Sequence, residues 1–181
     1  ENHAIWPELI KSGYAVATIN YRLSGDAKWP AQITDCKAAI RYLRAHSKDY
    51  NLAPGRIAVW GSSAGGHLAA LVCASGKARK LDAGEHLDQS SAVSCAVDMF
   101  GPIDFEKMPQ FASPDSPEAR MWGKATSEAL DLAREACPIS YLSKDTPPIL
   151  IFHGDADQVV NISQSRLFDA AIRKTGAPGE F

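Results

Sequence analysis

The sequence predicts an α/β protein with a mostly parallel sheet flanked by helices. Short apolar runs with strand-like composition alternate with longer runs of helical periodicity, as in sheets built from βαβ units. The run 149–152 is continuously apolar, which suits a strand covered on both faces. Polar motifs follow two of the strand-like runs directly, and functional groups of α/β proteins gather at the carboxyl ends of strands.

Composition limits the class of protein. The chain has 181 residues, 45% hydrophobic and 22% charged, which is typical of one globular domain with a substantial core. Its net charge of −2 gives no electrostatic reason to expect nucleic acid or an anionic membrane as partner. The four cysteines are widely spaced, and no Cys, His or carboxylate cluster indicates a metal site. We therefore expect no cofactor and a small-molecule substrate.

The first half of the chain predicts two strands and two helices. Residues 14–20 have the composition of a strand, and apolar residues within 30–48 recur at helical spacing. The segment 51–55 predicts a turn, and 56–60 predicts a second strand. A second helix is expected over 64–76, with a glycine at its end.

The second half continues the alternation. Residues 77–91 are charged and polar and predict a surface loop, whereas 92–100 predict a strand. The long connection 104–146 lacks strand signals, contains several prolines and includes a predicted helix at 127–136. The last elements are the strand 149–152 and a helix over 163–175.

The pentapeptide 61–65 reads G-S-S-A-G and lies between a predicted strand and a predicted helix. This is the context that a G-x-S-x-G nucleophile elbow requires, with Ser63 at the centre. The turn is so tight that side chains two residues away would collide, and we expect Gly61 and Gly65 to remove that collision. The amide of Ala64 would then point at a developing oxyanion. The alternative is a Gly/Ser-rich loop without chemical importance.

A second motif, H-G-D-A-D-Q-V-V, follows the strand 149–152. It places Asp155 and Asp157 just past the carboxyl end of a buried strand, where α/β enzymes collect functional groups. The alternative is a turn, because aspartate readily accepts hydrogen bonds from its own backbone.

Together these motifs resemble α/β-hydrolases of the serine esterase type, close to the hormone-sensitive-lipase-like, acetyl-esterase and feruloyl-esterase branches. The matching segments lie within about 14–175 and read NYRLS, GSSAGGHLA, FGPID and HGDADQVV. The order of serine before aspartate also fits that fold. The resemblance implies that Ser63 is the nucleophile, that Ala64 supplies an oxyanion-hole amide, and that Asp157 rather than Asp155 is the triad acid.

Two departures from the family pattern concern the ends of the chain. An H-G-G loop, expected before the strand 14–20, is absent, and no histidine follows Asp157. We expect residues 1–181 to form one partial α/β-hydrolase domain that is incomplete at both ends and nearly inactive alone. The family's H-G-G strand lies between 14–20 and 56–60, so these two strands are not expected to pair directly.

Several other residues are candidates near the site. Ser62, Tyr21 and His67 are expected to line the cleft. His67 lies four residues after Ser63 on the same helix face, so we weigh a role as base against packing on the sheet and favour packing. His153 is interpreted as a structural histidine.

The predicted function is a serine carboxylic-ester hydrolase that forms an acyl-enzyme on Ser63. By the resemblance, its substrates are short-acyl esters, with acetylated or feruloylated carbohydrates as candidates. A peptidase or formamidase on the same fold and a non-catalytic, hydrolase-derived binding protein are the alternatives. The connection 104–146 is interpreted either as a lid over the active site or as a structural connector.

Overall fold

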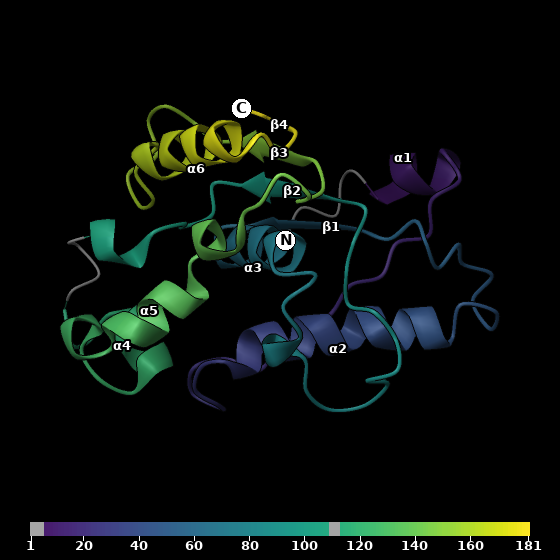
Figure 1. The fold of residues 1–181 in the computed structure, drawn as a ribbon, viewed down its shortest axis with the longest axis horizontal. Coiled ribbons are helices and arrows are strands. Elements are labelled where there is room, and N and C mark those ends of the chain that lie inside the picture. The colour runs from purple at the N-terminus through teal and green to yellow at the C-terminus, as the bar shows by residue number, and fades with distance from the viewer. Residues whose placement is uncertain (1–5, 109–112) are drawn as a thin grey trace.

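A four-stranded sheet forms the centre of the computed structural model, which describes residues 6–108 and 113–181 (Figure 1). The strands are β1 (Ala58–Ser62), β2 (Cys95–Met99), β3 (Ile149–Phe152) and β4 (Gly179–Glu180). They lie in the order β1-β2-β3-β4, and every neighbouring pair is parallel. The predicted α/β class with a parallel sheet is confirmed.

Three of the strands end at the same level. Ser62 pairs with Met99, and Met99 pairs with Phe152. The ladder continues for one residue, because the amide of Ser63 donates to Met99 O at 2.9 Å and that of Phe100 donates to Phe152 O at 2.7 Å. The segments that follow β1, β2 and β3 therefore begin side by side at one edge of the sheet.

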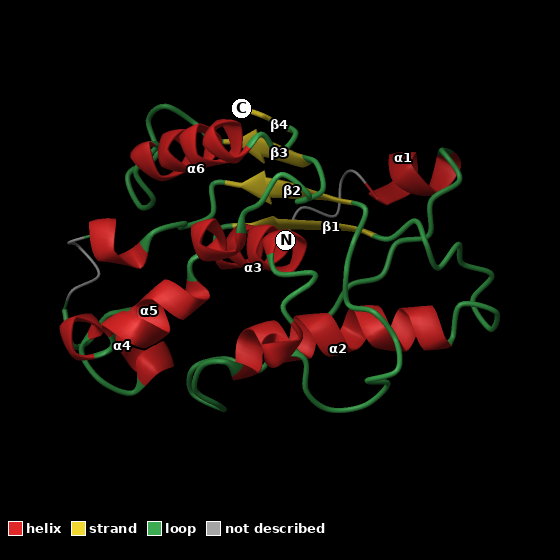
Figure 2. Ribbon diagram, viewed as in Figure 1, coloured by secondary structure: helices red, strands yellow, loops and turns green. Residues whose placement is uncertain are grey.

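Helices accompany the sheet (Figure 2), and the described residues form six α-helices. They are α1 (Trp6–Lys11), α2 (Ala31–Ala45), α3 (Ala64–Ala74), α4 (Pro117–Trp122), α5 (Leu130–Ala136) and α6 (Ser163–Thr175). Helix α3 packs on β1 and β2, α6 packs on β3 and β4, and α2 packs on α3. Short 3₁₀ helices occupy Arg79–Leu81, Phe105–Lys107, Thr126–Glu128 and Pro138–Tyr141. No described helix is both long and apolar enough to cross a membrane.

The two faces of the sheet differ in burial. Each new strand is added at the same side of the growing sheet. Right-handed crossover connections therefore place all the connecting helices on one face of the sheet. On that face Ala96, Ile149 and Ile151 are buried. On the other face Trp60 and Phe152 are 41% and 50% exposed. Within the described residues, the prediction that strand 149–152 is covered on both faces is therefore wrong.

The predicted elements correspond to observed ones, with one exception. The strand 149–152 and the helix 163–175 have the predicted bounds. The predicted helix 127–136 divides into a 3₁₀ turn and the shorter α5. Residues 14–20 form no strand and are almost entirely exposed. An isolated extended segment gains no ladder hydrogen bonds, and no described strand lies beside this one.

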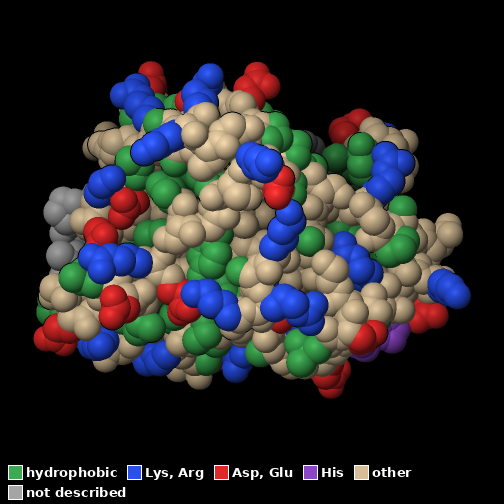
Figure 3. All heavy atoms as spheres, in the orientation of Figure 1, with side chains coloured by type: hydrophobic (Ala, Val, Ile, Leu, Met, Phe, Trp, Pro, Cys, Tyr) green, Lys and Arg blue, Asp and Glu red, His purple; other side chains and the backbone are tan. Residues whose placement is uncertain are grey.

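Charged side chains are interspersed on the face shown in Figure 3, with no large area of a single sign. In the interior, by contrast, Lys37 and Arg41 of α2 are fully buried. Both lie 3.3 Å from Asp82 Oδ1, and Lys37 also donates to the carbonyls of Ser75 and Ala78. This cluster fixes the loop after α3 against α2.

Replacement of Asp82 tests this cluster. Asp82→Asn leaves two buried cations without a counter-charge, so we expect the free energy of unfolding to fall by about 3 kcal/mol or more. The measurement is urea denaturation of the full-length protein. As a control, Asp145→Asn removes the exposed Lys77–Asp145 pair and should change stability by less than about 0.5 kcal/mol. Equal effects of the two substitutions would contradict the assignment.

Candidate active site

Ser63 lies between the end of β1 and the start of α3, and its side chain is exposed. Its backbone has φ 52° and ψ −122°, a region that costs a non-glycine residue of order 1–3 kcal/mol. Hydrogen bonds hold it there: its amide donates to Met99 O at 2.9 Å, and His67 N donates to its carbonyl at 3.0 Å. This is the strand–turn–helix geometry of a nucleophile elbow.

The two glycines of the motif have different roles. A Cβ on Gly61 would lie 2.1 Å from Gly65 O, so β1 and α3 approach each other more closely than any side chain at 61 allows. A Cβ on Gly65 would meet no other atom within 4 Å. The expectation that both positions exclude side chains is thus correct for Gly61 and wrong for Gly65.

This difference predicts opposite outcomes for two matched substitutions. Gly61→Ala should unseat α3 and lower the thermal midpoint strongly, because the collision is with backbone. Gly65→Ala should be tolerated or slightly stabilising, since alanine is favoured over glycine inside a helix by up to about 1 kcal/mol. Thermal denaturation of the full-length protein distinguishes them, and a destabilising Gly65→Ala with a neutral Gly61→Ala would refute the packing described.

Ala64 is the first residue of α3. The first amides of a helix have no intrahelical acceptor and lie at its positive end. The Ala64 amide is therefore a donor available to an anion that forms beside Ser63. Ser62, the last residue of β1, is exposed beside it.

Asp157 lies in the loop after β3. Its Oδ1 accepts from the amides of Val159 and Val160 at 2.8 and 2.9 Å, and its Oδ2 is 3.4 Å from His153 Nε2. The Val159 amide is the largest cause that lowers the pKa of this carboxyl below its ordinary value. Asp157 thus forms the turn that the sequence left as an alternative and also presents a carboxylate at the edge of the sheet. Asp155 is exposed.

His153 is held at both ring nitrogens. Nε2 lies 2.7 Å from Val160 O and Nδ1 lies 2.7 Å from Ser165 Oγ. Because a carbonyl only accepts, Nε2 carries a proton and donates to Val160 O, and Nδ1 shares the second hydrogen bond with the serine hydroxyl. The buried ring therefore fixes the Asp157 loop onto α6, in agreement with its interpretation as a structural histidine.

The cleft-lining role expected for His67 is incompatible with its position. The side chain is 4% exposed, and Nε2 donates to Ala136 O at 2.8 Å. Burial lowers its pKa to about 4, and its ring packs on the edge of Phe105. It links α3 to α5 and is not available as a base, which agrees with the packing alternative. Tyr21 is half-buried against the core.

The topology brings Ser63 and Asp157 to the same edge of the sheet, with β2 between their strands. Neighbouring strands lie about 4.8 Å apart, so the ends of β1 and β3 are roughly 10 Å apart. An imidazole between the two side chains would complete a triad. None of the described histidines stands there: besides His67 and His153, the rings of His46 and His86 pack on Tyr42 of α2. His3 lies outside the described residues.

The profile of the BD-FAE family matches residues 1–172. The chain belongs to the BD-FAE family.

Known proteins similar to this BD-FAE chain include several esterases. Esterase LipQ of Mycobacterium tuberculosis is 35% identical over 179 residues, which make up 97% of this chain and 42% of LipQ. A truncated form of a carbohydrate esterase from gut microbiota superposes with a TM-score of 0.92 and 38% identity, covering 98% of this chain and 68% of that one. An acetyl ester-xyloside bifunctional hydrolase from Caldicellulosiruptor lactoaceticus gives a TM-score of 0.72 and 33% identity over 89% and 57%.

These comparisons establish the α/β-hydrolase fold that the motifs predicted. The chain spans about two fifths of the length of LipQ.

One polar residue near the elbow escaped the sequence analysis. Asp98 lies inside β2, opposite Gly61, and is fully buried. Its Oδ1 accepts from Gly101 N at 2.9 Å, and its Oδ2 has no partner. Burial raises the pKa of this carboxyl to about 6. A carboxylate at a helix-facing position of a strand breaks the apolar pattern, and that break is the signal that could have identified it.

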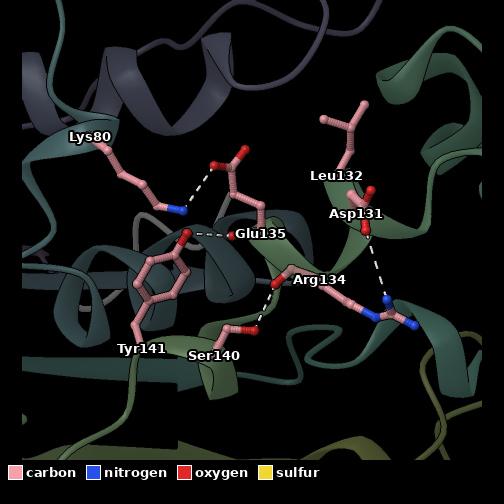
Figure 4. Close-up of a pocket in the computed structure, with 7 residues that line it drawn as sticks. All are labelled: Lys80, Asp131, Leu132, Arg134, Glu135, Ser140 and Tyr141. Carbon is pink, nitrogen blue, oxygen red and sulfur yellow. Dashed lines mark hydrogen bonds and ion pairs between the residues drawn. The ribbon is translucent and has the colours of Figure 1, made fainter.

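A surface hollow of about 450 Å³ lies elsewhere in the molecule (Figure 4). Its charged residues are mutually paired: Lys80 Nζ lies 3.1 Å from Glu135 Oε1, and Arg134 interacts with Asp131. The hollow includes neither Ser63 nor Asp157, and we assign it no role in the chemistry.

The raised pKa of Asp98 predicts a pH-dependent loss of stability. The folded protein holds the proton up to about pH 6, whereas the unfolded chain releases it near its ordinary value of about 3.9. Between these values the folded state binds more protons, so stability falls as the pH rises. Asp98→Asn lacks this titration and should gain up to about 3 kcal/mol over the wild type between pH 4 and pH 7. Parallel stability curves from urea denaturation at pH 4, 5, 6 and 7 would contradict the prediction.

Proposed function

We propose that the full-length protein is a serine carboxylic-ester hydrolase. The observation that carries the proposal is the conformation of Ser63, whose strained backbone exposes the hydroxyl at the amino terminus of α3. A backbone strain of this kind persists only where the surroundings enforce it and is frequent at active sites. The esterase names of LipQ and of the similar carbohydrate esterase support the same reaction.

The residues of the site suit acyl transfer. Ser63 Oγ attacks the ester carbonyl while a histidine from outside the described residues takes its proton. The amide of Ala64 donates to the oxyanion of the tetrahedral intermediate. As the ester C–O bond breaks, the histidine returns this proton to the leaving alcohol, and it then takes a proton from the water that hydrolyses the acyl-enzyme. Asp157, held as a carboxylate by two backbone amides, orients that histidine and stabilises its cation.

The substrate class that we propose is a short-acyl ester of a carbohydrate. It is supported by two similar structures, which are named a carbohydrate esterase and an acetyl ester-xyloside bifunctional hydrolase. Acetylated xylo-oligosaccharides and p-nitrophenyl acetate should be turned over, and peptidyl or formyl amides should not. Preference for an amide would instead support the peptidase or formamidase alternative, and turnover of neither class would favour a binding protein.

The connection 104–146 also enters the proposal. Its aromatic residues Phe105 and Trp122 are buried and pack on each other. Phe105 also packs on His67 of α3, and Trp122 packs on Trp29, just before α2. This anchoring supports the interpretation of α4 and α5 as a connector within one domain. Residues 109–112 of this connection lie outside the described part of the chain.

The choice between the two carboxylates is tested by paired substitutions in the full-length protein. Asp157→Asn should lower kcat by about 10³–10⁴-fold, because the base loses its orienting partner and the correct tautomer. Asp155→Asn should change kcat less than about threefold, since its side chain is exposed. Steady-state kinetics on p-nitrophenyl acetate measure both, with circular dichroism as the control for folding. A larger loss for Asp155→Asn would reverse the assignment.

A further inference from the structure

The loop after β2, residues 100–104, lies between the Ser63 elbow and the Asp157 loop. Its first residue, Phe100, continues the ladder to β3 and has a positive φ of 49°. Gly101 and Ile103 are buried, although they belong to no helix or strand. A buried loop must find partners for its backbone amides, because each unpaired amide in the interior costs free energy.

Two buried side chains supply those partners. Asp98 Oδ1 accepts from Gly101 N at 2.9 Å. Gln164 Oε1 accepts from Ile103 N at 2.8 Å and from Asp104 N at 2.7 Å. Asp98 is fully buried and Gln164 is 2% exposed. One acceptor comes from β2 and the other from the first turn of α6, 60 residues or more along the chain from the amides that it binds.

On the elbow side, the loop and the helix are in close backbone contact. A Cβ on Gly101 would lie 2.4 Å from His67 N and 2.6 Å from Asp98 Oδ1. A Cβ on Gly66 would lie 2.4 Å from the same oxygen. The Asp98 carboxylate thus lies between two glycines, one in the loop and one in the first turn of α3. Any shift of the loop must move that turn, which follows Ser63 directly and contains the Ala64 amide.

On the acid side, the ring of Phe100 packs edge-on against His153, with the centroids 6.3 Å apart. His153 Nε2 is in turn 3.4 Å from Asp157 Oδ2, and His153 Nδ1 is hydrogen-bonded to Ser165, the neighbour of Gln164 on α6. The loop therefore contacts both halves of the site.

We propose that Asp98 and Gln164 are positioning residues that hold the 100–104 loop and thereby fix the Ser63 elbow relative to the Asp157 loop. This role rests on the proposed ester hydrolysis. Neither residue touches the reacting atoms, and both act through the loop as hydrogen-bond acceptors. Because acceptance, rather than charge, is required at position 98, an amide oxygen serves there as well as a carboxylate.

The test uses four variants of the full-length protein: Asp98→Leu, Asp98→Asn, Gln164→Leu and the double leucine variant. Asp98→Leu and Gln164→Leu should each lower kcat about 10- to 100-fold on p-nitrophenyl acetate, as expected for a small displacement of reacting groups. KM should change less than about threefold. Asp98→Asn, which keeps the acceptor, should retain kcat within about threefold. The double variant should lose less than the product of the single losses, because both residues hold one loop.

Three controls separate the outcomes. Asp169→Asn alters another carboxyl with a buried, unpartnered oxygen and should leave kcat unchanged. Ser63→Ala must abolish turnover, and if it does not, the proposed function fails and not the positioning role. If Ser63→Ala is inactive while folded Asp98→Leu and Gln164→Leu keep wild-type kcat, the positioning role is wrong. If Asp98→Leu does not fold, the other two variants decide. Wild-type kcat in Gln164→Leu would overturn the proposal, and so would a large loss of kcat in Asp98→Asn.

Discussion

The close approach of β1 and α3 at Gly61 is the constraint on which the site depends. A Cβ at this position would come within 2.1 Å of Gly65 O, so the start of α3 lies almost against the end of β1. The chain has only one residue, Ser63, between the two elements. That residue must take a positive φ, and the serine side chain consequently points out of the sheet edge and not into the core. The strained backbone of Ser63 is thus a consequence of the close approach between the backbones of Gly61 and Gly65.

The same edge carries a carboxylate whose environment keeps it ionised. Two successive backbone amides point at Asp157 Oδ1, and the buried His153 ring holds the loop from below. Between the two halves, the loop after β2 donates its Gly101, Ile103 and Asp104 amides to buried side chains. The acceptors are Asp98 of β2 and Gln164 of α6. Polar groups are costly inside a core unless they are hydrogen-bonded. The hydrogen bonds that Asp98 and Gln164 accept from this loop offset that cost and hold the loop in one position beside the elbow.

Much of the fold could be predicted from the sequence because its signals are local. The apolar run at 149–152 and the amphipathic run at 163–175 gave correct bounds. The elbow motif identified the start of α3, whereas β1 ends at Ser62, two residues beyond the predicted end. The segment 14–20 has the composition of a strand, yet composition does not report whether a pairing strand lies beside it. The exposed face of the sheet was not predicted either, because the run 149–152 is apolar at every position. Its composition therefore does not distinguish the buried Ile149 and Ile151 from the exposed Phe152. For the site, Ser63 and Asp157 follow from motifs, whereas Asp98 and Gln164 are far apart in sequence and become related only when β2 and α6 are placed in space.

The central claim is that Ser63 is the nucleophile that carries the acyl group. The most direct measurement is treatment of the folded full-length protein with a fluorophosphonate probe, followed by peptide mass spectrometry. We expect a single phosphonyl adduct on Ser63, and none after prior heat denaturation, because reactivity depends on the assembled elbow. An adduct on Ser62 or on another serine, or no adduct on protein shown to be folded, would contradict it.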